Sequence, residues 1–377
     1  CDWSSDVCSS DLKRERVRIL QIGDSHTAGD IFSGRLRELF QERFGNAGRG
    51  MMPPGYPFPY WRPAQVEVAQ HGRWDVQSSN RTDYRPLPFG VSGFITESRA
   101  AGDTMSLEAN TDAEFDSIDI DYIRQPNGGR LDVSVDGRRV EQIDTRGPAG
   151  EWGRKTISTR AARTLELRTA GNGVTSIADW AVYKKTRGVV LDSFGFSGAE
   201  IGIVDHWSSP QLDRQLRDLS PALIVLAFGT NEGFRQSLNP AEYESQFRRI
   251  LKQLHDAAPA ASLLVVGPPD ANRLPDYCGI RPNQKEAVPC GPLSASEARD
   301  YSGMLAHRDR QLCRWHTPAG IALVRDVQRR AAADMGALFW DWSEVQGGAC
   351  GANRWVPQQL EHPDRIHMKE EIGRAHV

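Results

Sequence analysis

The chain has 377 residues, of which 39% are hydrophobic and 25% are charged, and its formal net charge at pH 7 is −3. This length suffices for one large domain or two ordinary ones, and the composition is that of a globular protein. The nearly balanced charge argues against nucleic acid or an anionic membrane surface as the main partner.

The two ends of the chain share an unusual coding property. Residues 6–11 can be encoded by GACGTGTGCTCTTCCGAT, and residues 372–377 can be encoded by the reverse complement of that string. One nucleotide element read in both directions at the two ends of a reading frame is typical of a translated sequencing adapter. We therefore interpret residues 1–12 and 372–377 as adapter-derived and exclude them from the fold prediction. We also expect the native signal region to be missing.

The first predicted strand is a short apolar run, residues 17–22, that leads into Gly-Asp-Ser at residues 23–25. Apolar residues then recur at helical spacing over residues 31–44, which predicts an amphipathic helix. Ser25 therefore lies at the carboxyl end of a strand, where open α/β sheets carry their reactive groups. Ser25 is a candidate nucleophile, and its hydroxyl needs a general base to be activated. The alternative is a purely structural role, in which Asp24 or Ser25 caps the helix.

Residues 44–55 are too rich in glycine and proline to continue the preceding helix. From residue 56 to residue 187, short segments with a period of two are typical of half-buried strands, and Asn127-Gly128 and Asp136-Gly137 are predicted hairpin turns. Roughly 130 residues of this kind predict a small β-sandwich. The predicted strands include residues 65–68, 117–123, 130–135, 164–168 and 177–183.

Strands alternate with helices again over residues 188–371, as they do over residues 13–55. This alternation predicts a parallel, three-layer α/β/α sheet, and hence one domain that the sandwich of residues 56–187 interrupts. Strands are predicted at 188–194, 222–228, 262–266 and 337–340, and helices after residue 201, at 240–257 and at 319–335.

Four cysteines remain once the adapter-like end is set aside. Late in the chain and within or near loops, they fit two disulfides in an oxidising compartment, although the sequence leaves their pairing open. Buried free thiols are the alternative, and a zinc site is disfavoured because no Cys-x-x-Cys pair occurs. With no nucleotide-binding glycine pattern either, we expect neither a metal nor a cofactor. The four are Cys278, Cys290, Cys313 and Cys350.

Four short blocks occur in a fixed order along the chain: Gly23-Asp24-Ser25-His26, Gly198, Gly229-Thr230-Asn231 and Asp364-x-x-His367. Together they resemble the signature blocks of the SGNH/GDSL hydrolases. The longer run Gly-Asp-Ser-His-Thr-Ala-Gly-Asp, the segment at residues 48–51 and the β-rich insertion resemble, more narrowly, the periplasmic peptidoglycan O-acetylesterases of that family. Those enzymes carry a carbohydrate-binding-like, jelly-roll-like sandwich inserted in the catalytic domain.

This resemblance implies a catalytic triad. Ser25 would be the nucleophile and His367 the base, while Asp364, three residues before His367, would orient the imidazole from within the same turn. Taken alone, His367 fits a surface histidine beside a helix start better than a catalytic base. His26 is a rival base, but adjacent residues on a sharp turn point in different directions, so we assign His26 to packing or substrate contact.

The resemblance also implies three donors to an oxyanion: the backbone N–H groups of Ser25 and Gly198, and the side-chain amide of Asn231, with Asp24 in support. A glycine lets substrate approach its N–H closely, and a carboxamide donates without being a competing base. The alternatives are that Gly198 is a plain turn glycine and that Asn231 is a helix cap. Gly195 competes with Gly198 for the role of oxyanion donor.

The sequence thus predicts a periplasmic or extracellular serine esterase that removes acetyl groups from a polysaccharide, with O-acetylated peptidoglycan as the expected substrate and an acetyl-enzyme on Ser25. A deacetylase of another glycan, an O-acetyltransferase and a non-catalytic glycan-binding protein are the alternatives. Aromatic residues of the insertion are candidates either for stacking on sugar faces or for the sandwich core: Tyr56, Phe58, Tyr60, Trp61, Trp74, Tyr84 and Trp152.

Overall fold

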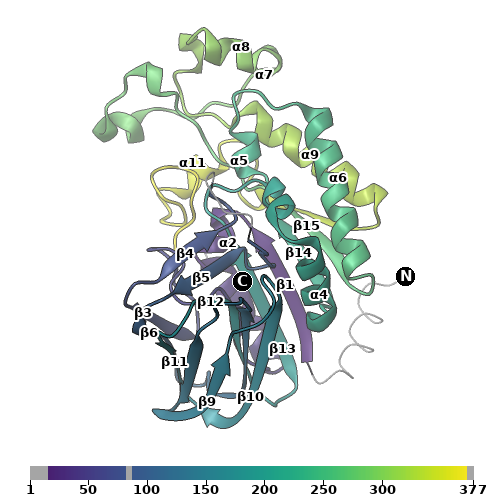
Figure 1. The fold of residues 1–377 in the computed structure, drawn as a ribbon. Helices are drawn as coiled ribbons and strands as arrows, with labels where there is room; N and C mark the ends of the chain where they lie inside the picture. Colours follow the sequence, from purple (N-terminus) through teal and green to yellow (C-terminus); the bar gives the residue numbers. More distant parts are fainter. Residues whose placement is uncertain (1–15, 82–86, 372–377) are drawn as a thin grey trace.

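The computed structural model describes residues 16–81 and 87–371. The interpretation of residues 1–12 and 372–377, and any role of Tyr84, lie outside this part of the chain. Figure 1 shows an α/β unit, with helices beside a central sheet, next to two antiparallel sheets.

The central sheet has five parallel strands in the order β13-β1-β14-β15-β16. The chain starts in the interior with β1, moves to the edge strand β13, and then crosses back to β14, so the order reverses between β1 and β14. This confirms the predicted parallel α/β sheet. The strands are β1 (Arg16–Gly23), β13 (Gly188–Gly195), β14 (Leu223–Ala227), β15 (Ser262–Gly267) and β16 (Leu338–Asp341).

Alternate side chains of β1 point to opposite faces of this sheet, because the side-chain period of a strand is two. Leu20 and Ile22 pack under α4 (Ser209–Leu219), α6 (Pro240–Ala257) and α9 (Ala319–Asp334). Val17 and Ile19 face the other layer. That layer consists of α3 (Ile31–Phe44) together with the short helices α10 (Trp342–Val345) and α11 (Gly351–Trp355).

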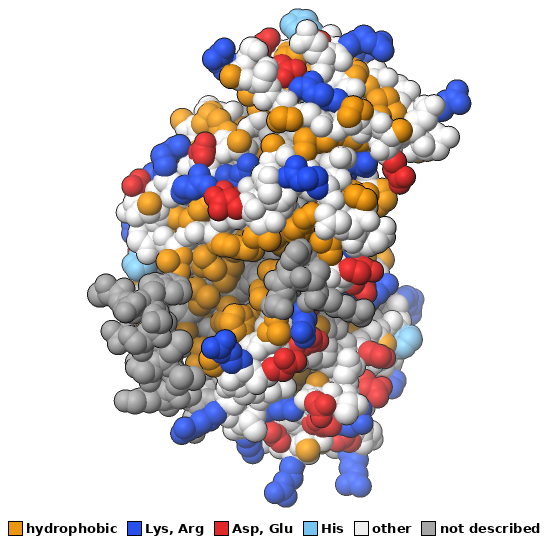
Figure 2. Space-filling model, turned by 180° about the vertical axis from the view of Figure 1, so that it is seen from behind, with side chains coloured by type: hydrophobic (Ala, Val, Ile, Leu, Met, Phe, Trp, Pro, Cys, Tyr) orange, Lys and Arg blue, Asp and Glu red, His pale blue; other side chains and the backbone are white. Residues whose placement is uncertain are grey.

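The described residues cover the second face only in part. An apolar groove of about 360 Å³ runs over it, lined by strand residues such as Val225 and Val266 and by the rings of Phe32, Trp340 and Trp342. Figure 2, the view from behind, shows hydrophobic side chains gathered in a hollow on this side of the molecule. Parallel sheets normally have both faces covered, so this hollow leaves core-type side chains accessible.

The insertion forms a sandwich of two antiparallel sheets, as predicted. One sheet has the order β10-β7-β12-β5-β4, with β2 also paired to β12, and the other has the order β3-β6-β11-β8-β9. Their inner faces share one apolar core. The strands are β2 (Gly50–Met52), β3 (Val66–His71), β4 (Asp75–Ser78), β5 (Phe94–Ser98), β6 (Ala101–Ala109), β7 (Phe115–Ile123), β8 (Arg130–Val135), β9 (Arg138–Asp144), β10 (Trp152–Ala162), β11 (Thr164–Ala170) and β12 (Thr175–Tyr183).

Gly50–Met52 forms a short strand that pairs with residues 180–182 of β12, a pairing that was not predicted from the sequence. One sequence prediction is wrong in this part. Asn127-Gly128 does not form a hairpin, since β7 and β8 lie in different sheets. A Cβ at Gly128 would collide with the Thr145 carbonyl. A glycine is therefore needed here because it lets the backbone at residue 128 lie close to the backbone at Thr145. Asp136 and Gly137 do turn the β8–β9 hairpin, and both have positive φ, at 48° and 74°.

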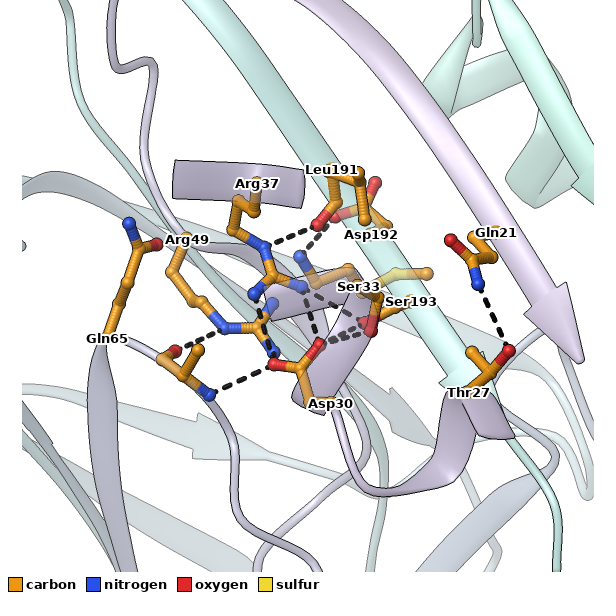
Figure 3. Close-up of polar contacts among 12 residues, drawn as sticks. Gln21, Thr27, Asp30, Ser33, Arg37, Arg49, Gln65, Leu191, Asp192 and Ser193 are labelled. Atoms are coloured by element: carbon orange, nitrogen blue, oxygen red, sulfur yellow. Dashed lines mark hydrogen bonds and ion pairs between the residues drawn. The ribbon is translucent and has the colours of Figure 1, made fainter. Parts of the chain in front are cut away.

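A buried cluster of charges joins the start of α3 to the segment that leads into the sandwich (Figure 3). The Asp30 carboxylate accepts hydrogen bonds from Arg37 at 3.0 Å, from Arg49 at 2.9 Å and from the backbone N–H of Ala64 at 3.0 Å. The Ser193 hydroxyl of β13 donates to it at 2.8 Å. Burial alone would raise the pKa of Asp30, but the two arginines hold it well below its ordinary value.

Two disulfides form within the last third of the chain, which confirms the expectation from cysteine number. They join Cys278 to Cys313 and Cys290 to Cys350. None of the described helices is long and apolar enough to cross a membrane. The remaining short elements are α2 (Ser25–Ala28), η1 (Ile201–His206), α5 (Thr230–Gly233), η2 (Asp276–Cys278), η3 (Pro282–Ala287), α7 (Ala295–Arg299), α8 (Tyr301–Ala306) and η4 (Arg310–Leu312).

Candidate active site

Ser25 is the first residue of α2, directly after β1, where the sequence places it. Gly23 makes this turn possible, because a Cβ there would lie 2.7 Å from the Ala227 carbonyl oxygen of β14. The Asp24 carboxylate accepts the backbone N–H of His26 at 3.0 Å and so caps α2. Ser25 is half-buried in the first turn of α2, at the carboxyl end of β1.

The structure brings Ser25, His367 and Asp364 into one hydrogen-bonded series. His367 Nε2 lies 3.2 Å from Ser25 Oγ, and His367 Nδ1 lies 2.8 Å from Asp364 Oδ2. The other carboxylate oxygen accepts the backbone N–H groups of Ile366 and His367 at 2.9 and 3.1 Å. Burial alone would raise the pKa of Asp364, but these hydrogen bonds hold it at about 2. The carboxylate is therefore ionised at neutral pH and suited to orient the imidazole.

Both members of the Asp364–His367 pair are accessible to water, with side chains 46% and 45% exposed. His367 borders a pocket of about 350 Å³ that also contains Ser25. Tyr60, on the segment between β2 and β3, contributes a ring that is 52% exposed. The lining residues are Ser25, His26, Gly29, Ile31, Phe32, Tyr60, Ser197, His362, His367 and Met368.

Gly198 follows β13 and faces open space. Its φ is +72°, and a Cβ there would meet no atom within 4 Å. Gly195, its rival, ends β13 against the backbone of Ala28, where a side chain would collide. Asn231, in α5 after β14, donates its side-chain N–H to the Ala199 carbonyl at 2.8 Å, and so joins its own helix to the Gly198 loop. Among the described residues, neither Gly198 nor Asn231 forms a hydrogen bond with Ser25.

These groups gather where the strand order of the central sheet reverses. Ser25 follows β1, and Asn231 follows β14, the strand next to it. Side chains at the carboxyl ends of parallel strands meet in a crevice at such a reversal. Residues 23–26 and 364–367, far apart in the sequence, line one pocket through Ser25, His26 and His367. Residues 229–231 lie at the same edge of the sheet, directly after β14.

Sequence reasoning missed the residues that support the His367 segment. At the end of β15, Asp270 accepts the backbone N–H of Ala352 at 3.1 Å, and Asn272 Oδ1 accepts that of Asn353 at 3.0 Å. The backbone N–H of Asn272 also donates to the Arg365 carbonyl at 2.9 Å. The sequence offered one signal for Asp270 and Asn272, namely their position shortly after a predicted strand. No group of His, Cys, Asp and Glu side chains able to hold a metal ion occurs over residues 16–81 and 87–371.

The aromatic residues of the insertion separate into core and surface. Trp61 and Trp152 are buried, and Tyr56, Phe58 and Trp74 pack against the sandwich core. Tyr60 alone among the described members of the predicted set combines high exposure with a place in the Ser25 pocket. It is therefore the aromatic residue of the insertion in the best position to contact a substrate.

A serine, a histidine and a carboxylate in hydrogen-bonded series at the carboxyl edge of a parallel sheet form the arrangement of α/β serine hydrolases. Residues 168–374, more than half of the chain, match the model of the GDSL-like Lipase/Acylhydrolase family, so the chain belongs to this family. It is a carboxylic ester hydrolase. The matched range begins near the end of the insertion and does not include the Gly-Asp-Ser-His block at residues 23–26.

Among solved structures, one described as "Peptidoglycan O-acetylesterase in action, 5 min" is similar to this chain at 24% identity and a TM-score of 0.72, over 97% of this chain and 90% of that one. At this identity the likeness establishes the fold. The structure of an active-site mutant of a family two carbohydrate esterase from Clostridium thermocellum matches at 8% identity and a TM-score of 0.31, over 81% of this chain and 95% of that one. This likeness is too low to support an argument. No curated protein sequence matches the chain significantly.

Proposed function

We propose that the chain is a serine esterase that removes O-acetyl groups from a polysaccharide, with O-acetylated peptidoglycan as its substrate. The observation that carries this proposal is the hydrogen-bonded series from Asp364 through His367 to Ser25, which opens into a solvent-exposed pocket. The division into a hydrolase domain of residues 13–55 and 188–371 and an insertion of residues 56–187 is part of the same proposal.

In the proposed reaction, Ser25 Oγ attacks the acetyl carbonyl while His367 Nε2 accepts the hydroxyl proton. The ionised Asp364 stabilises the resulting imidazolium. The backbone N–H groups of Ser25 and Gly198 and the amide of Asn231 donate to the negative oxygen of the tetrahedral intermediate. Its collapse releases the glycan hydroxyl, which takes the proton from His367. Water then attacks the acetyl-enzyme by the same proton path and releases acetate.

Several features support a glycan as the alcohol part of the ester. The pocket is open to solvent, as access to a polymer requires, and Tyr60 presents an aromatic face on which the apolar face of a sugar ring can stack. The likeness in fold to a peptidoglycan O-acetylesterase favours that polymer. Two disulfides fit an oxidising compartment, and hence the periplasm or the cell exterior.

The test is acetate release from O-acetylated peptidoglycan, compared with O-acetylated xylan and with 4-nitrophenyl acetate. We expect release from all three, with the highest kcat/KM among the two polymers on peptidoglycan. Higher kcat/KM on xylan would assign another glycan. Cleavage of the aryl ester alone would retain the esterase and reject a polysaccharide substrate, and no cleavage by folded protein would leave the glycan-binding alternative.

Replacing Tyr60 with alanine should weaken binding of the polymer while leaving the chemistry intact. One aromatic stacking contact is worth about 0.5–1.5 kcal/mol, so we expect KM for O-acetylated peptidoglycan to rise roughly 2- to 12-fold. Neither kcat nor the kinetics with 4-nitrophenyl acetate should change. The matched control is Tyr60→Phe, which keeps the ring and should resemble the wild type. An equal rise in KM for the aryl ester would contradict a role in glycan recognition.

A further inference from the structure

The proposed triad depends on the alignment of two segments that are about as far apart in the sequence as the chain allows. Residues 23–30 carry Ser25, and residues 361–371 carry His367. Apart from the His367–Ser25 contact itself, one hydrogen bond joins these two segments among the described residues. It runs from His26 Nε2 to the carbonyl oxygen of Ile366, at 2.7 Å.

The other ring nitrogen of His26 is also occupied. Its Nδ1 lies 3.0 Å from Asp24 Oδ1, so a carboxylate oxygen and a carbonyl oxygen face the two ring nitrogens. A carbonyl oxygen and an ionised carboxylate only accept hydrogen bonds, so each ring nitrogen supplies a proton when Asp24 is ionised. This geometry favours an imidazolium at His26, paired with Asp24. Burial alone would lower the pKa of His26, but the charge of Asp24 and the two hydrogen bonds raise it.

Burial makes this pairing rigid. The side chains of His26 and Asp24 are only 3% and 2% exposed, and the His26 and Trp342 rings pack in an edge-type arrangement at a centroid distance of 5.8 Å. Asp24 is fixed in turn by the backbone N–H of His26. With both nitrogens engaged, His26 has no lone pair with which to accept the Ser25 proton, and it cannot be the rival base.

We propose that His26 is a positioning residue: a buried imidazolium that ties the Ser25 turn to the backbone directly before His367 and so sets the distance between base and nucleophile. This inference rests on the proposed function, because it concerns the same triad. Ile366 and His367 are adjacent, so a shift of the Ile366 carbonyl moves the imidazole of His367 with it. A displacement of about 1 Å at such a group can lower the rate roughly 100-fold.

Two substitutions separate positioning from simple packing. His26→Gln places an amide N–H near the former Nε2 and preserves the bond to Ile366. His26→Asn places its amide near the former Nδ1 and can reach only Asp24. Both remove the ring and its charge, so a role in stability alone would affect them alike.

With 4-nitrophenyl acetate, we expect kcat of His26→Asn to fall roughly 30- to 100-fold with KM unchanged, and kcat of His26→Gln to fall less than about 5-fold. Equal losses in the two variants, or losses confined to KM or to thermal stability, would overturn the proposal. Ser25→Ala is measured in parallel. If the wild type is inactive or Ser25→Ala retains activity, the proposed function fails and the inference fails with it. If both behave as expected while the two His26 variants are equal, the inference alone fails.

A measurement on the wild type covers the case in which a variant does not fold. In a ¹⁵N-labelled sample at pH 6.5, the ordinary pKa of histidine, both ring nitrogens of His26 should show the chemical shifts of protonated nitrogen. The spectrum of a neutral tautomer, with one unprotonated ring nitrogen, would overturn the charged link to Ile366.

Discussion

Replacing Ser25 with alanine is expected to lower kcat by roughly 10⁴- to 10⁶-fold on both the aryl acetate and the acetylated glycan. The reason is that Ser25 Oγ is the only hydroxyl hydrogen-bonded to His367 among the described residues. In the proposed mechanism the variant cannot form the acetyl-enzyme, and the remaining groups can only bind and polarise the ester. The measurement is acetate release, together with mass spectrometry after treatment with an organophosphate, which should label Ser25 in the wild type and nothing in the variant.

The matched control for this substitution is Ser197→Ala. Ser197 lines the same pocket and is exposed, but its side chain has no hydrogen bond to His367 among the described residues. We expect near wild-type kcat and normal labelling of Ser25. Neither alanine should alter the thermal unfolding midpoint appreciably, since each removes one accessible hydroxyl. Retained activity in Ser25→Ala, or an equal loss in Ser197→Ala, would reject Ser25 as the nucleophile.

Among the variants considered, replacing Asp30 with alanine should lower the free energy of unfolding most, by about 3–5 kcal/mol. The reason is that the substitution leaves two buried arginines without their carboxylate partner. Arg37 and Arg49 both pair with this carboxylate, and the side chains of all three are 2% exposed or less. Chemical denaturation followed by tryptophan fluorescence measures the effect. Because the cluster lies between α3 and the segment leading into the sandwich (Figure 3), we also expect the two parts to separate more easily during unfolding.

Two further variants test whether charge is the cause. Asp30→Asn keeps the shape and should cost less than Asp30→Ala. Asp326→Ala, which removes an exposed partner of Arg329 on α9, should leave the free energy of unfolding nearly unchanged. The folded-state pKa of Asp30 is lowered, so its charge stabilises the fold at every pH above the ordinary value of 3.8. The difference between wild type and Asp30→Asn should therefore be the same at about pH 5 and pH 7, and shrink only in more acidic solution. If this difference already shrinks between pH 7 and pH 5, the lowered pKa of Asp30 is contradicted.

Patterns that depend on neighbours in the sequence were predicted well. The helix predicted at residues 240–257 has those limits, and the helix predicted at 319–335 ends one residue earlier. Both predictions succeeded because apolar residues at helical spacing place one face of the helix against the core, whatever the rest of the fold. The parallel sheet was also predicted well, because its strands are short apolar runs separated by helices. The positions of Ser25, Gly198 and Asn231 just after strands followed from this alternation alone.

Sequence reasoning missed or misassigned elements where a distant segment decided the structure. Residues 50–52 are a strand only because β12 offers an unpaired edge. Asn127-Gly128 has the composition of a hairpin turn, yet the strands on its two sides joined different sheets. In both cases the local sequence was compatible with more than one structure, and contacts with residues far along the chain selected one of them.

By itself, the sequence determined the class of chemistry and the order of the elements, because short motifs and hydrophobic periodicity are local properties. Only the tertiary structure decided which side chains meet. It paired Cys290 with Cys350, brought Tyr60 of the insertion to the Ser25 pocket, and gave His26 the carbonyl of Ile366 as a partner 340 residues away. Each of these contacts depends on how sheets and loops pack in three dimensions, and no pattern within a single segment records that packing.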